Sequence, residues 1–180
     1  YHKDNLPSFP FLVDIELTNH CNLECIFCGQ QAMTRPKGFM HEAVFRKVID
    51  ECSSYNTPVR FIRWGEPFLH PEIMSFCRYV KSKNLPIHIT TNGLAFNEGD
   101  METLIELGVD SLIFSFQGAT KDQYEIMRPN RNLYIISHYD KLKANILKLV
   151  KLRGDRAKPY IHIWSTMTNE SREEVDSFID

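Results

Sequence analysis

The sequence predicts an α/β fold built on a parallel sheet, and three observations support this prediction. Five β-like runs alternate with helical patterns along the 180 residues. Hydrophobic residues make up 43% of the chain and charged residues 24%, as in a globular protein with a substantial core. Because each strand is followed by a helix, right-handed crossovers place successive strands parallel to one another.

The five predicted strands are short apolar runs, and the first shows the period-two pattern of half-buried β-structure. It alternates Val13, Ile15 and Leu17 with Asp14 and Glu16. The full set of predicted strands is 11–17, 59–63, 87–91, 111–116 and 160–166. In a parallel sheet, functional residues are expected where these strands end.

The predicted helices carry apolar stripes at helical spacing. Two stripes, at 44–52 and 73–80, include Cys52 and Cys77, so we expect both cysteines to lie in the core. Further helices are predicted from Asp100 to Gly108, from Thr120 with Gln123 three residues on, from Ser137 to Gly154, and from 169–171.

Domain organisation and charge limit the classes of partner. Residues 1–10 are predicted to form an extended lead-in, and residues 11–180 one core domain. With 21 Lys and Arg against 23 Asp and Glu, the net charge of −2 gives no bulk attraction to nucleic acid or anionic lipid. No apolar run reaches the roughly 18 residues that a membrane span needs. We therefore expect neither a nucleic-acid nor a membrane partner.

Three of the five cysteines form a C-x3-C-x2-C motif after the first strand: Cys21, Cys25 and Cys28. Clustered thiols in an odd total favour metal ligands in a reducing compartment, here the cytoplasm, over a disulfide framework. Three thiolates from one loop can hold three corners of a 4Fe-4S cluster and leave the fourth iron open. The alternatives are a Cys3His zinc site, using His20 or another histidine, and three buried thiols.

Short polar motifs follow the next strands. Gly65-Glu66-Pro67 follows the second strand, and Thr91-Asn92-Gly93 follows the third. Residues 21–28, with Phe27 before the last cysteine, resemble the C-x3-C-x-aromatic-C signature of the radical S-adenosylmethionine (SAM) enzymes. Residues 65–67 resemble the Gly-Gly-Glu-Pro motif of that family, and residues 91–93 resemble its third-strand motif.

Two further segments resemble the branch of this family that often carries a cysteine-rich extension, the SPASM branch. They are residues 115–118, at the end of the fourth strand, and residues 124–129. The resemblance implies a partial TIM-type barrel of six βα units, of which a parallel (βα)5 is visible. We therefore expect the radical SAM core to stop before its sixth strand.

The resemblance also implies a reaction and its cofactors. Family members bind a 4Fe-4S cluster and SAM, and they cleave SAM reductively to a 5′-deoxyadenosyl radical that abstracts hydrogen from a peptide or small-metabolite substrate. Such oxygen-sensitive enzymes take electrons from a donor such as flavodoxin or ferredoxin. The alternative function is a binding module in which zinc or an inert cluster stabilises a βα scaffold without catalysis.

The resemblance assigns a role to individual residues. Cys21, Cys25 and Cys28 are expected to bind the cluster and to act in catalysis. The expected SAM-binding residues are Phe27 near adenine, Gly65 and Glu66 at the amino group, Asn92, Arg128 at the carboxylate, and Ser115, Gln117 and Ser165 near the ribose. The sequence departs from the family motif at Trp64, which replaces the first glycine and either narrows the cavity or packs under SAM. Before it, Arg63 is placed to meet an anionic substrate or Glu16.

Overall fold

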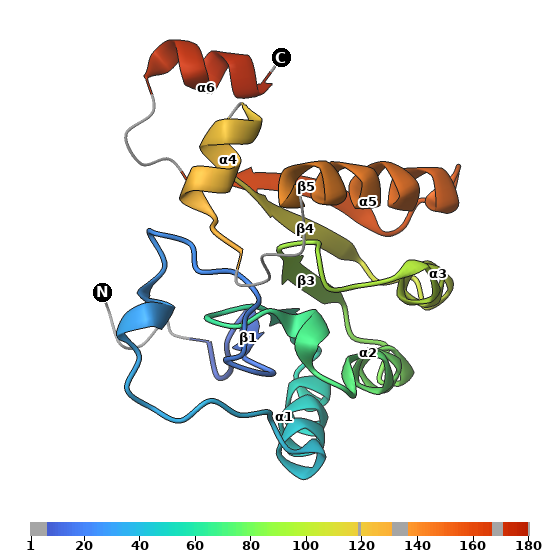
Figure 1. Ribbon diagram of the computed structural model, residues 1–180. Helices are drawn as coiled ribbons and strands as arrows, with labels where there is room; N and C mark the ends of the chain where they lie inside the picture. Colours follow the sequence, from blue (N-terminus) through green and yellow to red (C-terminus); the bar gives the residue numbers. More distant parts are fainter. Residues whose placement is uncertain (1–6, 119, 131–136, 167–170, 180) are drawn as a thin grey trace.

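The computed structural model describes residues 7–118, 120–130, 137–166 and 171–179. Its centre is a five-stranded parallel sheet in the order β1-β2-β3-β4-β5, which confirms the α/β class and the parallel (βα)5 arrangement (Figure 1). The strands are β1 (Val13–Ile15), β2 (Val59–Phe61), β3 (Ile87–Thr91), β4 (Ser111–Phe116) and β5 (Tyr160–Ser165).

The helices of the described residues are α1 (Glu42–Ser54), α2 (Ile73–Ser82), α3 (Glu98–Glu106), α4 (Lys121–Met127), α5 (His138–Arg153) and α6 (Arg172–Ile179). Four of them, α1, α2, α3 and α5, lie along one face of this sheet. Figure 1 shows α1, α2, α3 and α5 side by side along the strands. Two short 3-10 helices, η2 (Gly29–Ala32) and η3 (Pro67–Leu69), were not predicted from the sequence.

The core lies between the helices and the sheet. Phe45 of α1 stacks on Phe76 of α2, with ring centroids 3.9 Å apart. Cys52 and Cys77 are 1% and 0% exposed, which confirms that both belong to the core. Burying these apolar side chains is the main force that holds the helices on the sheet.

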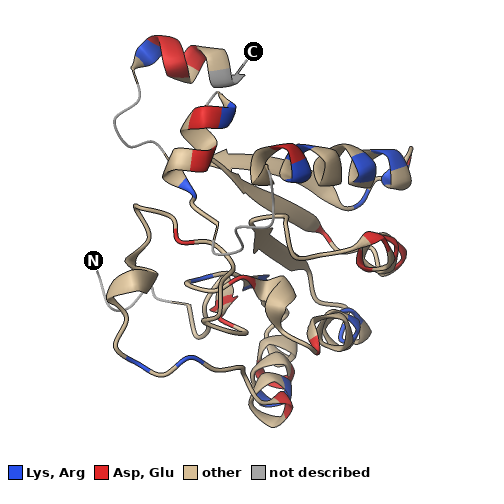
Figure 2. Cartoon of the chain, in the orientation of Figure 1, with Lys and Arg blue, Asp and Glu red and all other residues tan. Residues whose placement is uncertain are grey.

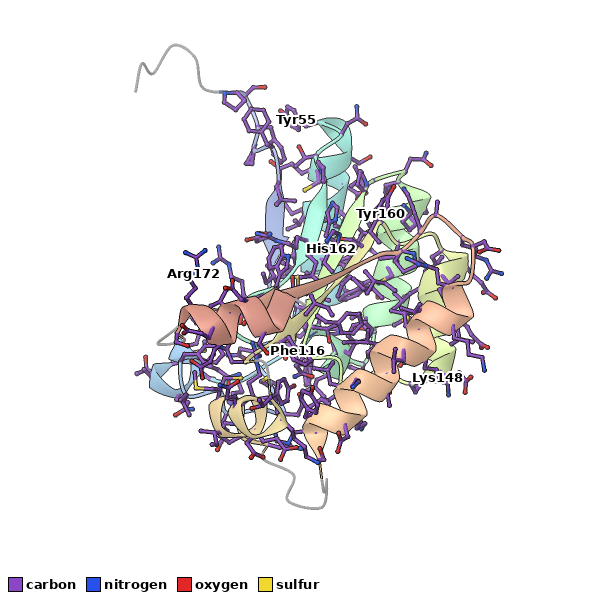
Figure 3. The ribbon with its side chains drawn as sticks, turned by 90° about the horizontal axis from the view of Figure 1, so that it is seen from above. Tyr55, Phe116, Lys148, Tyr160, His162 and Arg172 are labelled. Carbon is purple, nitrogen blue, oxygen red and sulfur yellow. The ribbon has the colours of Figure 1, made fainter. Side chains whose placement is uncertain are left out.

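The other face of the sheet is polar. Asp14, Arg60, His88 and Ser111 are register neighbours on β1 to β4, so their side chains form a row across it. On β5, Tyr160 and His162 are exposed on the side away from α5 (Figure 3). This polar face contrasts with the packed apolar interior of a closed TIM barrel.

Several predicted boundaries were wrong. The strands β1 and β2 are shorter than expected, because the ladder between them ends where Arg63 takes a φ of +123°, outside the β region. The helix expected to start at Asp100 begins at Glu98 instead. Asn97 caps it, and Asp100 completes a capping box. The expected helix start at 169 and 170 lies outside the described residues.

Two further features concern the helices. The lysines of α5 lie on its exposed side, as a solvated basic face (Figure 2). Among the described residues, no helix is long and apolar enough to cross a membrane.

Candidate functional site

A cavity of about 180 Å³ opens at the carboxyl ends of the strands. The three clustered cysteines and the predicted motif residues share its wall. The lining includes Cys21, Cys25, Phe27, Cys28, Arg63, Trp64, Gly65, Glu66, Thr90, Thr91, Asn92, Ser115, Arg128 and Thr166. Segments separated by up to 145 residues (21 to 166) therefore meet at one site.

The cysteine loop is held by its own turns. The backbone N–H of Cys28 donates to the carbonyl of Cys25 at 3.0 Å, and Cys28 then caps η2. Each of the three sulfur atoms lies near an N–H donor. Asn92 Nδ2 is 3.9 Å from Cys21 Sγ, Arg128 Nη1 is 3.6 Å from Cys25 Sγ, and the N–H of Gln30 is 3.5 Å from Cys28 Sγ. Such donors stabilise the thiolate form that binds metal.

A second segment, distant in sequence, supports this loop. The N–H groups of Glu24 and Ile26 donate to the carbonyls of Pro129 and Met127, at 2.8 and 3.0 Å. This pairing follows directly from the end of α4, and it brings Arg128 against a cysteine 103 residues away.

The ionisation of the thiols bears on metal loading. Burial, followed by the neighbouring Glu66, raises the pKa of Cys21 to about 11, and burial also raises the pKa of Cys25 against the opposing effect of Arg128. Metal binding at these thiols therefore releases protons.

The donor set suits a cluster better than a single ion. Among the described residues, no group of three or more His, Cys, Asp and Glu side chains converges as it would around one metal ion. In a 4Fe-4S cluster each cysteine binds a different iron, so three thiols need to be neighbours without meeting at one point. Cys21, Cys25 and Cys28 meet that condition by lining one cavity.

Glu66 is the buried carboxylate of the site, at 2% exposure. Its Oε1 accepts from the Thr91 hydroxyl at 2.7 Å and from the Phe68 N–H at 3.2 Å, and its Oε2 accepts from the Asn92 N–H at 2.7 Å. Burial raises the pKa of Glu66 to about 7, against these hydrogen bonds. A carboxylate has about four acceptor positions, so one on Oε2 is left for a donor in the cavity.

The residues before Glu66 approach the cysteine loop closely. A Cβ on Gly65 would lie 1.9 Å from the carbonyl oxygen of Thr18, so only glycine fits there. The ring of Trp64 lies against Gly29, where an added Cβ would be 3.2 Å from Cη2. Trp64 therefore lines the cavity beside η2.

Arg128 is a buried residue of the cavity lining, at 6% exposure. Its Nη2 donates to the carbonyl of Phe116 at 3.1 Å, and its guanidinium lies 5.1 Å from the centre of the Phe27 ring. Phe116, the last residue of β4, is labelled in Figure 3. The Nε atom of Arg128 is buried without a hydrogen-bond partner among the described residues.

The other predicted SAM-binding residues divide into two groups. Phe27, Gly65, Asn92 and Ser115 line the cavity with Glu66 and Arg128. Among the described residues that form the lining, Gln117 and Ser165 are absent. Gln117 is fully buried, and its side-chain N–H donates to the carbonyl of Thr166, which ties the ends of β4 and β5 together.

Sequence reasoning missed several residues that shape the site. The side-chain N–H of Gln30 donates to the carbonyls of Asn19 at 2.8 Å and Trp64 at 2.9 Å, and so fixes η2 to the ends of two strands. Asn22 accepts from Asn92 Nδ2 at 2.7 Å. Asparagine and glutamine side chains that bridge segments in this way show no recognisable spacing in the sequence. The only available signal was that Gln30 is a polar residue in a loop expected to be buried.

Comparison with curated proteins gives two relatives of similar sequence. The chain is 29% identical over 167 residues to a tungsten-containing aldehyde ferredoxin oxidoreductase cofactor-modifying protein of Pyrococcus furiosus, covering 89% of this chain and 45% of that protein. It is 31% identical over 120 residues to an AdoMet-dependent heme synthase of Methanosarcina barkeri, covering 66% of this chain and 34% of that protein. The chain thus spans less than half the length of either relative.

Among solved structures, the fold is similar to that of Streptococcus suis SuiB bound to S-adenosylmethionine. The TM-score is 0.80 at 18% identity, covering 98% of this chain and 39% of SuiB. The family profile described as the Radical SAM superfamily matches residues 15–180. Because that match takes in nearly the whole chain, including the cysteine loop and the end of every strand, the chain belongs to the radical SAM superfamily.

Proposed function

We propose that this chain binds a 4Fe-4S cluster and SAM side by side and forms the radical-generating core of an enzyme. When both are bound, the cluster and SAM supply a one-electron cleavage of SAM. A product of that cleavage takes a hydrogen atom from a substrate. The observation that carries the proposal is the shared cavity, in which three cysteines of one loop face the buried carboxylate of Glu66.

The cysteines hold the cluster in this proposal. Cys21, Cys25 and Cys28 give up their protons and each binds one iron, while Asn92 and Arg128 keep their N–H groups near the sulfurs. Three cysteines leave one iron for the amino and carboxylate groups of SAM. A zinc site requires a fourth convergent ligand, and no observation favours that alternative.

The remaining cavity residues position SAM. Glu66 offers the free acceptor position on Oε2 to the amino group of SAM, and Gly65 lets the backbone before Glu66 lie close to Thr18. The guanidinium of Arg128, a residue of the cavity lining, is assigned to the carboxylate of SAM. Phe27 is assigned to the adenine side, and Asn92 and Ser115 to the polar wall. Gln117 acts by fixing the strand ends, and Ser165 stays a ribose candidate through its place at the end of β5.

The experiment is anaerobic reconstitution of the chain with iron and sulfide. We expect a brown protein with close to four irons for each chain, as the 4Fe-4S stoichiometry requires. Addition of dithionite and SAM should then give 5′-deoxyadenosine. A colourless protein that binds zinc in place of iron would contradict the proposal. Iron content is the primary measurement, because it does not depend on how fast SAM is cleaved.

The substrate and the partners follow from the same proposal. A peptide or small-molecule substrate is supported by relatives, since SuiB has been solved with the precursor peptide SuiA and the chain is 26% identical over 117 residues to a PqqA peptide cyclase of Gluconobacter oxydans. The cluster needs a one-electron donor, such as flavodoxin or ferredoxin. A cytoplasmic location belongs to the same proposal and is supported by the free thiols.

A further inference from the structure

Arg63 has a backbone conformation that side chains disfavour. It follows β2 directly, with a φ of +123°, in the region that glycine adopts most easily. The preceding residue, Ile62, still donates its N–H to the carbonyl of Ile15 at 3.2 Å. The strained φ therefore falls on Arg63, directly after the last hydrogen bond between the two strands. A strained residue beside a binding site points to a function of its side chain.

The side chain of Arg63 is not needed to balance a buried acid. Its Nη2 lies 3.7 Å from Oδ2 of Asp14, and the side chain is 58% exposed. Asp14 is already held by Arg60, whose Nε and Nη2 donate to its two carboxylate oxygens at 2.8 and 3.0 Å. Two arginines therefore share one carboxylate, and one positive charge is left over.

Other acidic groups nearby do not take up this charge. Glu16 of the same region is paired with Arg35. Glu66 accepts three hydrogen bonds from its own surroundings, and among the described residues no lysine or arginine nitrogen lies within ion-pair distance of it. Arg63 lines the cavity, and its exposed guanidinium is thus a cation with donors to spare.

We propose that Arg63 recognises an anionic group, a carboxylate or a phosphate, on the substrate that shares this cavity with SAM. The inference rests on the proposed function and adds the chemical class of the substrate. A planar guanidinium with several N–H groups binds either anion through paired hydrogen bonds. The carboxylate of SAM itself is assigned to the buried Arg128.

The first experiment measures anion binding to the cluster-free chain by tryptophan fluorescence. The probes are inorganic phosphate and succinate at constant ionic strength, and a Trp164→Phe background assigns the signal to Trp64, next to Arg63. We expect saturable binding of at least one probe, and a preference between them identifies phosphate or carboxylate as the group. Arg63→Gly should weaken that binding at least about tenfold, Arg63→Lys by less, and the control Arg35→Gln should leave it unchanged.

A second measurement separates recognition from a structural role. Glycine relieves the strained φ, so Arg63→Gly should raise the melting temperature by a few degrees, on the order of 2–4 °C. A lower melting temperature with unchanged anion affinity, or no saturable binding to the unsubstituted chain, would overturn the proposal. So would a loss of SAM affinity in reconstituted Arg63→Gly, which would place the residue in the SAM site. Since the anion titration uses no cluster, its failure is distinct from a failure of reconstitution.

Discussion

The backbone N–H of Asn92 donates to Oε2 of Glu66 over 2.7 Å, and this bond joins the ends of β3 and β2 through a buried carboxylate. The same oxygen is the one with an acceptor position left for a ligand. Glu66 therefore joins two strand ends and, in the proposed function, also binds SAM, so a test of either role needs a measurement of the other.

Replacement of this carboxylate by an amide should weaken SAM binding. Glu66→Gln removes the charge that faces the amino group of SAM, and the amide N–H2 cannot accept from Asn92. Loss of one partner of a buried charged pair lowers affinity by about ten- to a thousandfold. Titration of the reconstituted variant with SAM measures this, with iron content as the check on folding. The exposed Glu98→Gln is the control. Equal affinities at equal iron content would exclude Glu66 from the SAM site.

The raised pKa of Glu66 predicts how stability depends on pH. Its pKa is about 7 in the folded chain against 4.5 for the ordinary side chain, so the folded state binds the proton more tightly. This contribution to the free energy of unfolding is complete below pH 4.5 and is lost as the pH rises towards 7. Its size is on the order of 3 kcal/mol. Urea unfolding of the cluster-free chain at several pH values should show this fall. Glu66→Gln should lack it, and a variant with the same slope would refute the assignment.

Substitution of single cysteines should separate ligands from core residues. Cys25→Ala removes one of three cluster ligands and should abolish a stable cluster. Cys52→Ala and Cys77→Ala alter only buried packing, so both should keep full iron content and lose about 1–2 kcal/mol of stability. Iron and sulfide analysis of the three reconstituted variants decides between these outcomes. Cluster loss in folded Cys77→Ala, or its retention in Cys25→Ala, would show that the ligand assignment is wrong.

Gly29 and Trp64 should be energetically coupled. A Cβ at Gly29 would lie 3.2 Å from the Trp64 ring, so Gly29→Ala should lower the free energy of unfolding by forcing the ring to shift by a few tenths of an ångström. In a Trp64→Ala background the ring is absent, so Gly29→Ala should lower the free energy of unfolding by less. A double-mutant cycle by denaturant unfolding measures the difference, which is expected to exceed about 0.5 kcal/mol. Strictly additive effects would mean that the ring moves aside freely.

Much of the fold could be predicted from the sequence, because periodicity records which face of an element is buried. The five strands and the helices that follow them were placed correctly for this reason. Strand ends were not. The ladder between β1 and β2 stops at a local backbone conformation, the positive φ of Arg63, and no hydrophobic pattern encodes that.

The site was predictable only where short motifs carried it. The cysteine loop, Glu66 and Asn92 each stand in a compact motif, and the structure brings them to one cavity. The contact between Arg128 and Cys25 joins residues 103 positions apart, and the bridging role of Gln30 depends on two backbone carbonyls. Such contacts arise from tertiary packing, so they could not be found from spacing along the chain.

The pairing of the cysteine loop with the segment after α4 has a consequence for biosynthesis. The N–H groups of Glu24 and Ile26 donate to the carbonyls of Pro129 and Met127. During translation those partners are made about a hundred residues after the cysteines. Until then the cysteine loop lacks this support, so we expect stable cluster loading to follow synthesis of residues 127–129. Stalled nascent chains ending before residue 127 should retain no iron, whereas chains that expose residues 127–129 should retain it.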